Sequence, residues 1–114
     1  HTDVLMYVGT SAIGICYEVI KPEYRDLVKE RVERFHDVIE IKKEQLLNFC
    51  GNCLEIPDKD GNLLLAMSTA AFNAYTELQK EKIEKHFKKI VHSDISTIEK
   101  YGGGSARCML AELF

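Results

Sequence analysis

The segment GGGSARC, residues 102–108, places three glycines shortly before a cysteine in a chain that has only 7 glycines and 4 cysteines. Ordered glycines lose much backbone entropy, so a folded protein keeps them mainly where backbone must approach a neighbour closely. Backbone N–H groups and the nearby Arg107 would favour a thiolate over a thiol. Cys108 is therefore the leading candidate for a nucleophile, although a small buried side chain is the commoner role of a free cysteine.

A histidine and a carboxylate stand at the other end of the chain, in HTDVLM. His1 and Asp3 precede an apolar run that predicts a buried strand, and alternate residues of an extended segment share one face. An imidazole is suited to proton transfer, and a carboxylate is suited to binding a cation. The alternative is that the terminal histidine is a tag remnant without a role.

Cys50 and Cys53 form a C-x-x-C motif, which suggests a metal or redox site. Two further histidines, His86 and His92, could complete a zinc site, but they lie too far along the chain for a small zinc finger. A thioredoxin-like pair follows a strand and opens a helix, whereas this pair precedes a predicted strand. We therefore expect no metal and no cofactor, and we expect His36, His86 and His92 to be solvated.

The composition is that of one ordinary soluble domain, with 114 residues, 46% of them hydrophobic and 29% charged. A net charge of -3 argues against binding to nucleic acid or to an anionic membrane, and it favours a small cationic partner. No apolar run approaches the roughly 20 residues that span a bilayer. The core-forming pattern favours reduced thiols in the cytoplasm over a disulfide scaffold.

The elements that must position these side chains begin with two apolar runs, which predict strands over 3–9 and 12–20. A helix with Pro22 near its start follows, with apolar residues at helical spacing and charged residues between them. The run DVIEI, residues 37–41, then predicts a third strand.

The same plan occurs a second time after the short helical piece KEQLLNF. Strands are predicted over 52–56 and 63–67 around the turn PDKDGN, and a charged helix over 76–87 has Thr76 as its N-cap. The run KIVHS predicts the closing strand. The sequence thus predicts an α/β fold of two ββαβ modules with a final cysteine segment: 3–50, 51–95 and 96–114.

Two acidic residues, Glu99 and Glu112, flank the glycine-rich segment. They could serve as site acids, but surface carboxylates are the more common interpretation. The mixed-charge run ELQKEKIEKHFKK predicts a solvated helix face.

Three segments taken together, HTDVLM, the GN pair at 51–52 and GGGSARCMLAELF, resemble the C-terminal part of the guanidine-modifying, pentein-fold superfamily. This superfamily includes arginine deiminases, dimethylarginine dimethylaminohydrolases and glycine amidinotransferases. The likeness is greatest to bacterial amidinotransferase-like proteins associated with citrulline or arginine hydrolysis. It covers essentially the whole chain, and the glycine-rich stretch that ends in Cys108 is its most specific part.

The resemblance implies an α/β propeller of five ββαβ modules around a central channel, of which this chain would supply two. It implies that Cys108 is the nucleophile and that His1 is the general acid and base. The residues that would bind or position the substrate are Asp3, Asn52, Gly103 and Gly104. A further acidic segment of the family would lie upstream of His1.

The function implied is hydrolysis of the guanidinium group of arginine or a related small guanidine. A covalent thiouronium on Cys108 would release ammonia or an amine and then a ureido product such as citrulline. Two alternatives stay open, namely amidino transfer to an amine acceptor and a non-catalytic guanidine-binding fragment. We expect the 114-residue piece alone to have little or no activity, because it would lack the N-terminal modules of its protein, and we expect it to associate, for example as a homo-oligomer, or to fold incompletely because its module edges would be open.

Overall fold

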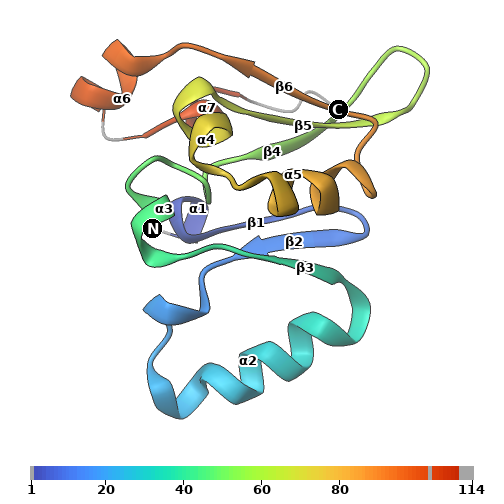
Figure 1. Ribbon diagram of the computed structural model, residues 1–114, viewed down its shortest axis with the longest axis vertical. Helices are drawn as coiled ribbons and strands as arrows, with labels where there is room; N and C mark the ends of the chain where they lie inside the picture. Colours follow the sequence, from blue (N-terminus) through green and yellow to red (C-terminus); the bar gives the residue numbers. More distant parts are fainter. Residues whose placement is uncertain (1, 103, 111–114) are drawn as a thin grey trace.

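The computed structural model describes residues 2–102 and 104–110, and for Asp3 it describes the backbone alone (Figure 1). Within these residues the strands form two three-stranded sheets of the same topology. In each sheet the middle strand pairs antiparallel with the strand before it and parallel with the strand after it. The first sheet contains β1 (Met6–Val8), β2 (Ala12–Ile15) and β3 (Asp37–Glu40). The second contains β4 (Leu54–Pro57), β5 (Leu63–Ser68) and β6 (Lys89–Ser93).

Helices supply the crossovers that the parallel pairs require. The crossover of the first sheet is α2 (Pro22–Phe35), and that of the second consists of α4 (Thr69–Ala74) and α5 (Glu77–Glu84). The mixed α/β class and the order strand, strand, helix, strand are therefore confirmed. The module limits and the five-module propeller stay predictions. The shorter helices are α1 (Thr2–Leu5), the 3-10 helix η1 (Tyr17–Val19), α3 (Lys43–Leu46), α6 (Ser96–Gly102) and α7 (Ala106–Met109).

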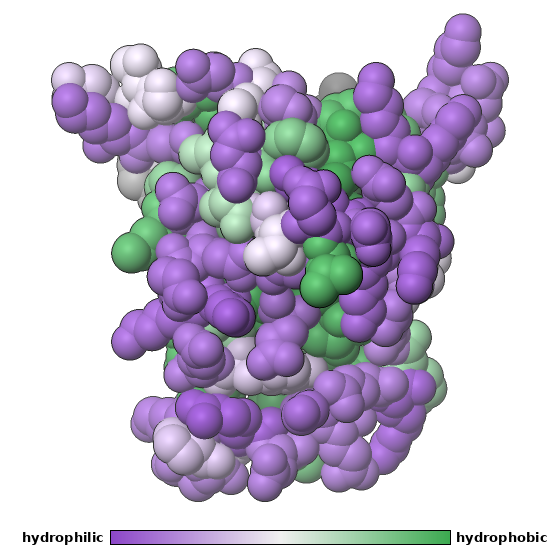
Figure 2. Space-filling model, in the orientation of Figure 1, coloured by the Kyte–Doolittle hydropathy of each residue, from purple (hydrophilic) through white to green (hydrophobic). Residues whose placement is uncertain are grey.

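The helix α2 covers one face of the first sheet. Pro22 stands in its first turn, where the fixed φ of proline suits a helix start. Val28 and Val32 pack against a cluster that includes Ile13 and Ile15 of β2. Charged residues fill most of the outer face of α2, although three of its large hydrophobic side chains are also exposed. Figure 2 shows a largely hydrophilic surface over this helix. No helix in the described part of the chain is both long and apolar enough to cross a membrane.

The other face of the first sheet packs against the second unit, so that one core serves both. Ala12 and Ile39 of the first sheet share a buried cluster with Leu65, Ile83 and Phe87. Figure 1 shows α5 between the two sheets, which is consistent with its contacts to β3 and β6. A strand that is covered on both faces is apolar at consecutive positions, and this explains why every residue of β2 is buried.

The observed elements correct several predicted boundaries. The run predicted as a strand over 3–9 begins as the helix α1, and its strand starts only at Met6. The second strand ends at Ile15 and not at Ile20, because η1 follows it, and β4 starts at Leu54 and not at Asn52. The helix α4 was not predicted. Short apolar runs have no periodicity that separates a buried strand from a buried helical turn, which accounts for these differences.

Polar side chains hold the two units together around the shared core. The Glu55 carboxylate accepts hydrogen bonds from the Thr10 backbone N–H at 2.8 Å and from the Thr10 hydroxyl at 2.7 Å. The side-chain amides of Gln45 and Gln79 bond to each other at 2.7 and 3.0 Å. Each of these pairs joins residues of the first unit to residues of the second, so the units are fixed in orientation as well as in contact.

His86 forms a third link between the units, and the expectation that it is merely solvated is wrong. Its Nδ1 lies 2.7 Å from the Ser11 hydroxyl, and its Nε2 lies 2.9 Å from a carboxylate oxygen of Asp37. Lys82 approaches the other Asp37 oxygen at 3.3 Å. The hydrogen bond from His86, followed by the interaction with Lys82, lowers the pKa of Asp37 below its ordinary value.

We expect replacement of Asp37 by asparagine to lower the free energy of unfolding at neutral pH by less than about 1 kcal/mol, because the ion pair is partly exposed. A carboxylate with a depressed pKa stabilises the fold above its ordinary pKa, about 4, and this stabilisation is lost as the pH falls through the lower pKa of the folded state. Thermal unfolding of both proteins between pH 7 and pH 2 should therefore give Tm values that converge in acid. Asp26→Asn, at an exposed position on α2, is the control, and a gap that persists undiminished at pH 2 would contradict the assignment.

Candidate active site

Cys108 lies on the short helix α7, and its side chain is exposed. The other three cysteines, Cys16, Cys50 and Cys53, are all buried. Covalent chemistry needs a thiol that can both ionise and meet its substrate. Of the four thiols in the chain, only that of Cys108 meets the second requirement.

Asn52 connects the middle of the chain to this thiol. Its side chain is completely buried, its Nδ2 donates to the Cys108 Sγ at 3.3 Å, and its Oδ1 accepts from the Ser105 backbone N–H at 3.1 Å. A buried amide that is bonded through both ends is held in one orientation. The structure thus brings together two residues that the sequence singled out, Asn52 and Cys108, although 55 residues separate them in the chain.

Gly104 lies against the cysteine so closely that a larger residue would collide with it. A Cβ atom at this position would stand 2.9 Å from the Sγ and 3.0 Å from the Cβ of Cys108. At Gly102 the same added atom would meet only Ile98, at 3.8 Å. The close approach predicted for the glycine run is therefore found at Gly104. Gly103, which was also predicted to contact substrate, lies outside the described residues.

Gly51 connects the same loop to the beginning of the chain. A Cβ atom on Gly51 would stand 2.2 Å from the Val4 carbonyl oxygen, so only glycine allows this approach to α1. The dipeptide Gly51–Asn52 therefore contacts the backbone of α1 on one side and Cys108 on the other. This dipeptide therefore connects the N-terminal segment HTDVLM to the segment GGGSARC, the two segments that the sequence singles out for a catalytic role.

The proposed pairing of His1 with Asp3 rested on an extended backbone, and that premise is wrong. Residues Thr2–Leu5 form the helix α1, in which side chains two positions apart do not share a face. His1 and the side chain of Asp3 lie outside the described residues. Their roles stay predictions that derive from the family resemblance alone.

A cavity of about 310 Å³ is lined by residues from the N-terminal elements and by a residue of α7. It is lined on one side by α1 and β1 and on the other by Arg107. Thr2, next to His1 in the sequence, and Arg107, next to Cys108, thus line the same space. The lining residues are Thr2, Met6, Tyr7, Val8 and Arg107.

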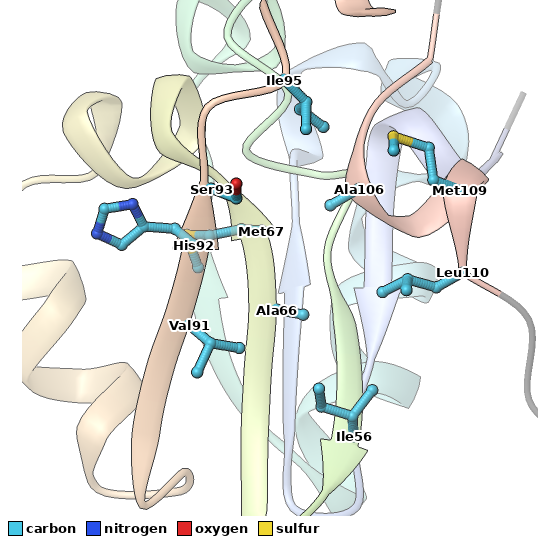
Figure 3. Close-up of a pocket in the computed structure, with 10 residues that line it drawn as sticks. All are labelled: Ile56, Ala66, Met67, Val91, His92, Ser93, Ile95, Ala106, Met109 and Leu110. Carbon is cyan, nitrogen blue, oxygen red and sulfur yellow. The ribbon is translucent and has the colours of Figure 1, made fainter.

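A second pocket, of about 290 Å³, lies between the second sheet and α7 (Figure 3). Figure 3 shows Ala106, Met109 and Leu110 facing side chains of the strands. Its lining is almost wholly apolar and includes no carboxylate, so these residues offer no charge to a guanidinium. His92 lines this pocket and is exposed, as expected, and its ring also stacks on Phe72 with ring centroids 4.1 Å apart.

The C-x-x-C motif belongs to the core. Cys50 and Cys53 have no exposed surface, and the Cys53 thiol donates to the Cys50 carbonyl oxygen at 3.3 Å. Burial raises the pKa of Cys50 to about 12 and that of Cys53 further still. A thiol with so high a pKa is a poor nucleophile at neutral pH. Among the described residues no three His, Cys, Asp or Glu side chains are grouped as metal ligands.

Ser105 and Glu99 are further residues of the site, for which the sequence predicted either no role or a surface role. Ser105 is fully buried, and its hydroxyl donates to a carboxylate oxygen of Glu99 at 2.6 Å. The sequence favoured a surface role for Glu99. A serine just before a short helix is a recognisable N-cap signal, but nothing in the sequence indicates that this hydroxyl bonds to Glu99.

Two solved structures share the fold. The apo crystal structure of ArgZ, an arginine dihydrolase from the ornithine-ammonia cycle in cyanobacteria, has a TM-score of 0.69 and 16% sequence identity, over 95% of this chain and 15% of that one. The product-bound N-terminal domain of ArgZ has a TM-score of 0.69 and 19% identity, over 95% of this chain and 36% of that one. The chain therefore spans well under half the length of either structure, and at these identities the likeness concerns the fold.

The family model that matches this chain, together with the fold shared with ArgZ, places the chain in the guanidine-modifying, pentein-fold superfamily. Within that class, the chain belongs to the family described as N,N dimethylarginine dimethylhydrolase, eukaryotic, whose model matches residues 1–114. No curated protein sequence matches the chain.

Proposed function

We propose that the protein containing this chain hydrolyses the guanidinium group of arginine or of a related small guanidine, with Cys108 as the nucleophile. The observation that carries the proposal is the exposed Cys108 thiol with the buried Asn52 amide directed at it from 3.3 Å. The family match and the activity in the name of ArgZ support a guanidine substrate.

The surroundings of Cys108 suit attack on a cation. A guanidinium is planar, and its central carbon is a weak electrophile because the charge is delocalised over three nitrogens. The Sγ would add to this carbon as a thiolate and form a tetrahedral adduct. The adduct carries no new oxyanion, so this step needs no oxyanion hole, and the Asn52 amide, as a donor to the sulfur, would act earlier by favouring the thiolate that attacks.

The remaining steps require a proton donor and a water molecule. In the proposal His1 protonates the departing nitrogen, the C–N bond breaks, and ammonia or an amine leaves a thiouronium on Cys108. His1 then takes a proton from water, which attacks the same carbon. The C–S bond breaks while the hydroxyl of this adduct gives up its proton to the released ammonia or amine, and the neutral ureido product and the thiolate are released. Asp3 would bind the guanidinium through its carboxylate.

The decisive experiment uses the longest natural polypeptide that contains these 114 residues. It is incubated separately with arginine and with N,N-dimethylarginine, and the ureido product is measured together with ammonia and dimethylamine. We expect citrulline with one equivalent of ammonia or of dimethylamine, and the amine released identifies the substrate. Arginine binding by calorimetry without any product would overturn the proposal in favour of a non-catalytic guanidine-binding protein.

A second arm adds glycine as an amine acceptor. Hydrolysis predicts a product yield that does not depend on the acceptor. Product that forms only with glycine present would overturn hydrolysis in favour of amidino transfer.

A further inference from the structure

Ser105 occupies the N-cap position of α7, the helix that carries Cys108, but its hydroxyl makes no capping hydrogen bond. An N-cap serine normally accepts from a backbone N–H in the first turn of its helix. Here the hydroxyl donates to the Glu99 carboxylate at 2.6 Å, and the residue has no exposed surface. The hydroxyl thus bonds to α6 and not to a backbone N–H of its own helix, so the contact with α6 accounts for the position of this serine.

The backbone of Ser105 determines which end of the Asn52 amide faces the thiol. Its N–H donates to the Asn52 Oδ1 at 3.1 Å, and this occupies the oxygen end of the amide. The Nδ2 end therefore faces the Cys108 Sγ at 3.3 Å. An amide NH₂ group only donates, and a donor favours thiolate over thiol. The reverse orientation would direct an acceptor at the sulfur and disfavour the reactive form.

The Glu99–Ser105 hydrogen bond also closes the glycine-rich connection between α6 and α7. Glu99 lies inside α6, while Gly102 ends that helix and Gly104 directly precedes Ser105. Gly102 and Gly104 have more backbone freedom than other residues would have at these two positions. A charge-assisted hydrogen bond across the connection restricts that freedom at the residue whose N–H orients Asn52.

We propose that Glu99 and Ser105 are positioning residues for the nucleophile: the Glu99 carboxylate holds Ser105, Ser105 orients the Asn52 amide, and the amide presents its N–H group to Cys108. This role rests on the proposed function of Cys108 but not on the identity of the substrate. Neither Glu99 nor Ser105 needs to touch a substrate.

The test compares Ser105→Ala, Glu99→Ala and Glu99→Gln in the longest natural polypeptide that contains the chain. The alkylation rate of Cys108 with iodoacetamide is measured from pH 5 to pH 10, and kcat and KM are measured with the guanidine that is turned over. We expect both alanine variants to slow the alkylation of Cys108 at neutral pH several-fold and to lower kcat by up to about a hundredfold with little change in KM. Glu99→Gln keeps an acceptor oxygen and should recover most of both losses.

Glu81→Ala, at an exposed position on α5, is the matched control and should leave both readouts unchanged. Thermal unfolding shows which variants are folded. If Ser105→Ala does not fold, the comparison of Glu99→Gln with Glu99→Ala still tests the positioning role. Unchanged alkylation profiles in folded alanine variants would overturn the positioning role, even if kcat fell with stability. Slower alkylation of the alanine variants in a protein that turns over no guanidine would support the positioning role while the proposed function fails.

Discussion

Replacing Cys108 by serine is expected to lower kcat/KM for the guanidine substrate by roughly a thousandfold or more, while the protein stays folded. A serine hydroxyl is far less ionised than a thiol at neutral pH, so the proposed attack on a guanidinium carbon would lose its nucleophile. The position is exposed, and its side chain belongs to neither core cluster, so the fold does not depend on the sulfur. Product formation and Tm, measured on the same preparation, separate these two effects.

Alkylation supplies the control for this prediction. Because the other three thiols of residues 1–114 are buried, iodoacetamide should label the native protein at Cys108 alone within these residues, and it should label none of them in the serine variant. Mass spectrometry of the intact protein and of its peptides measures both outcomes. A serine variant that forms product at the parent rate would remove Cys108 from the mechanism, whatever the labelling shows.

Gly104→Ala should lower kcat by about a hundredfold, with a much smaller effect on stability. The new methyl group would stand 2.9 Å from the Cys108 Sγ, so the cysteine side chain must rotate or α7 must shift. Either response breaks the 3.3 Å contact with Asn52 and misplaces the nucleophile. The group that gives way is the end of a small side chain, and this is why the cost falls on activity more than on folding.

Gly102→Ala is the matched control, since it makes the same chemical change two residues earlier. Its methyl group would meet only Ile98 at 3.8 Å, and alanine at the end of α6 favours the helix by up to about 1 kcal/mol. Steady-state kinetics and thermal unfolding of both variants measure the contrast. If Gly104→Ala keeps full activity, or if both variants lose activity equally, the glycine is not needed for the placement of Cys108.

The arrangement of strands could be predicted because most of its signals are local. Apolar runs, the turn around Gly61 with its φ of 83°, Pro22 at a helix start and Thr76 at an N-cap each act within a few residues. The helical start at Thr2–Leu5 could not be predicted in this way. Its backbone packs against Gly51, and no local pattern indicates a contact between residues so distant in the sequence.

The residues of the candidate site also differ in whether the sequence could predict them. Cys108 and Asn52 could be named from residue types and from the family resemblance, and the structure brings them into contact. The bond from Ser105 to Glu99 was missed because an exposed glutamate and a glutamate bonded to a buried serine look identical in a sequence. The C-x-x-C pair shows the opposite case, since a conspicuous motif turned out to be core packing around Cys50.

The length of the connection between the two sheets should be conserved as chains of this kind diverge. Loops between repeated units ordinarily tolerate insertions and deletions. The segment from β3 to β4 contains both Gly51, held against Val4, and Asn52, held against Cys108, so a change in its length would displace two contacts at once. The turn between β4 and β5 makes no such contact at Gly61, where an added side chain would meet open space. Length variation among descendants of this sequence should therefore accumulate in the β4–β5 turn, while the connection between the sheets keeps its residue count.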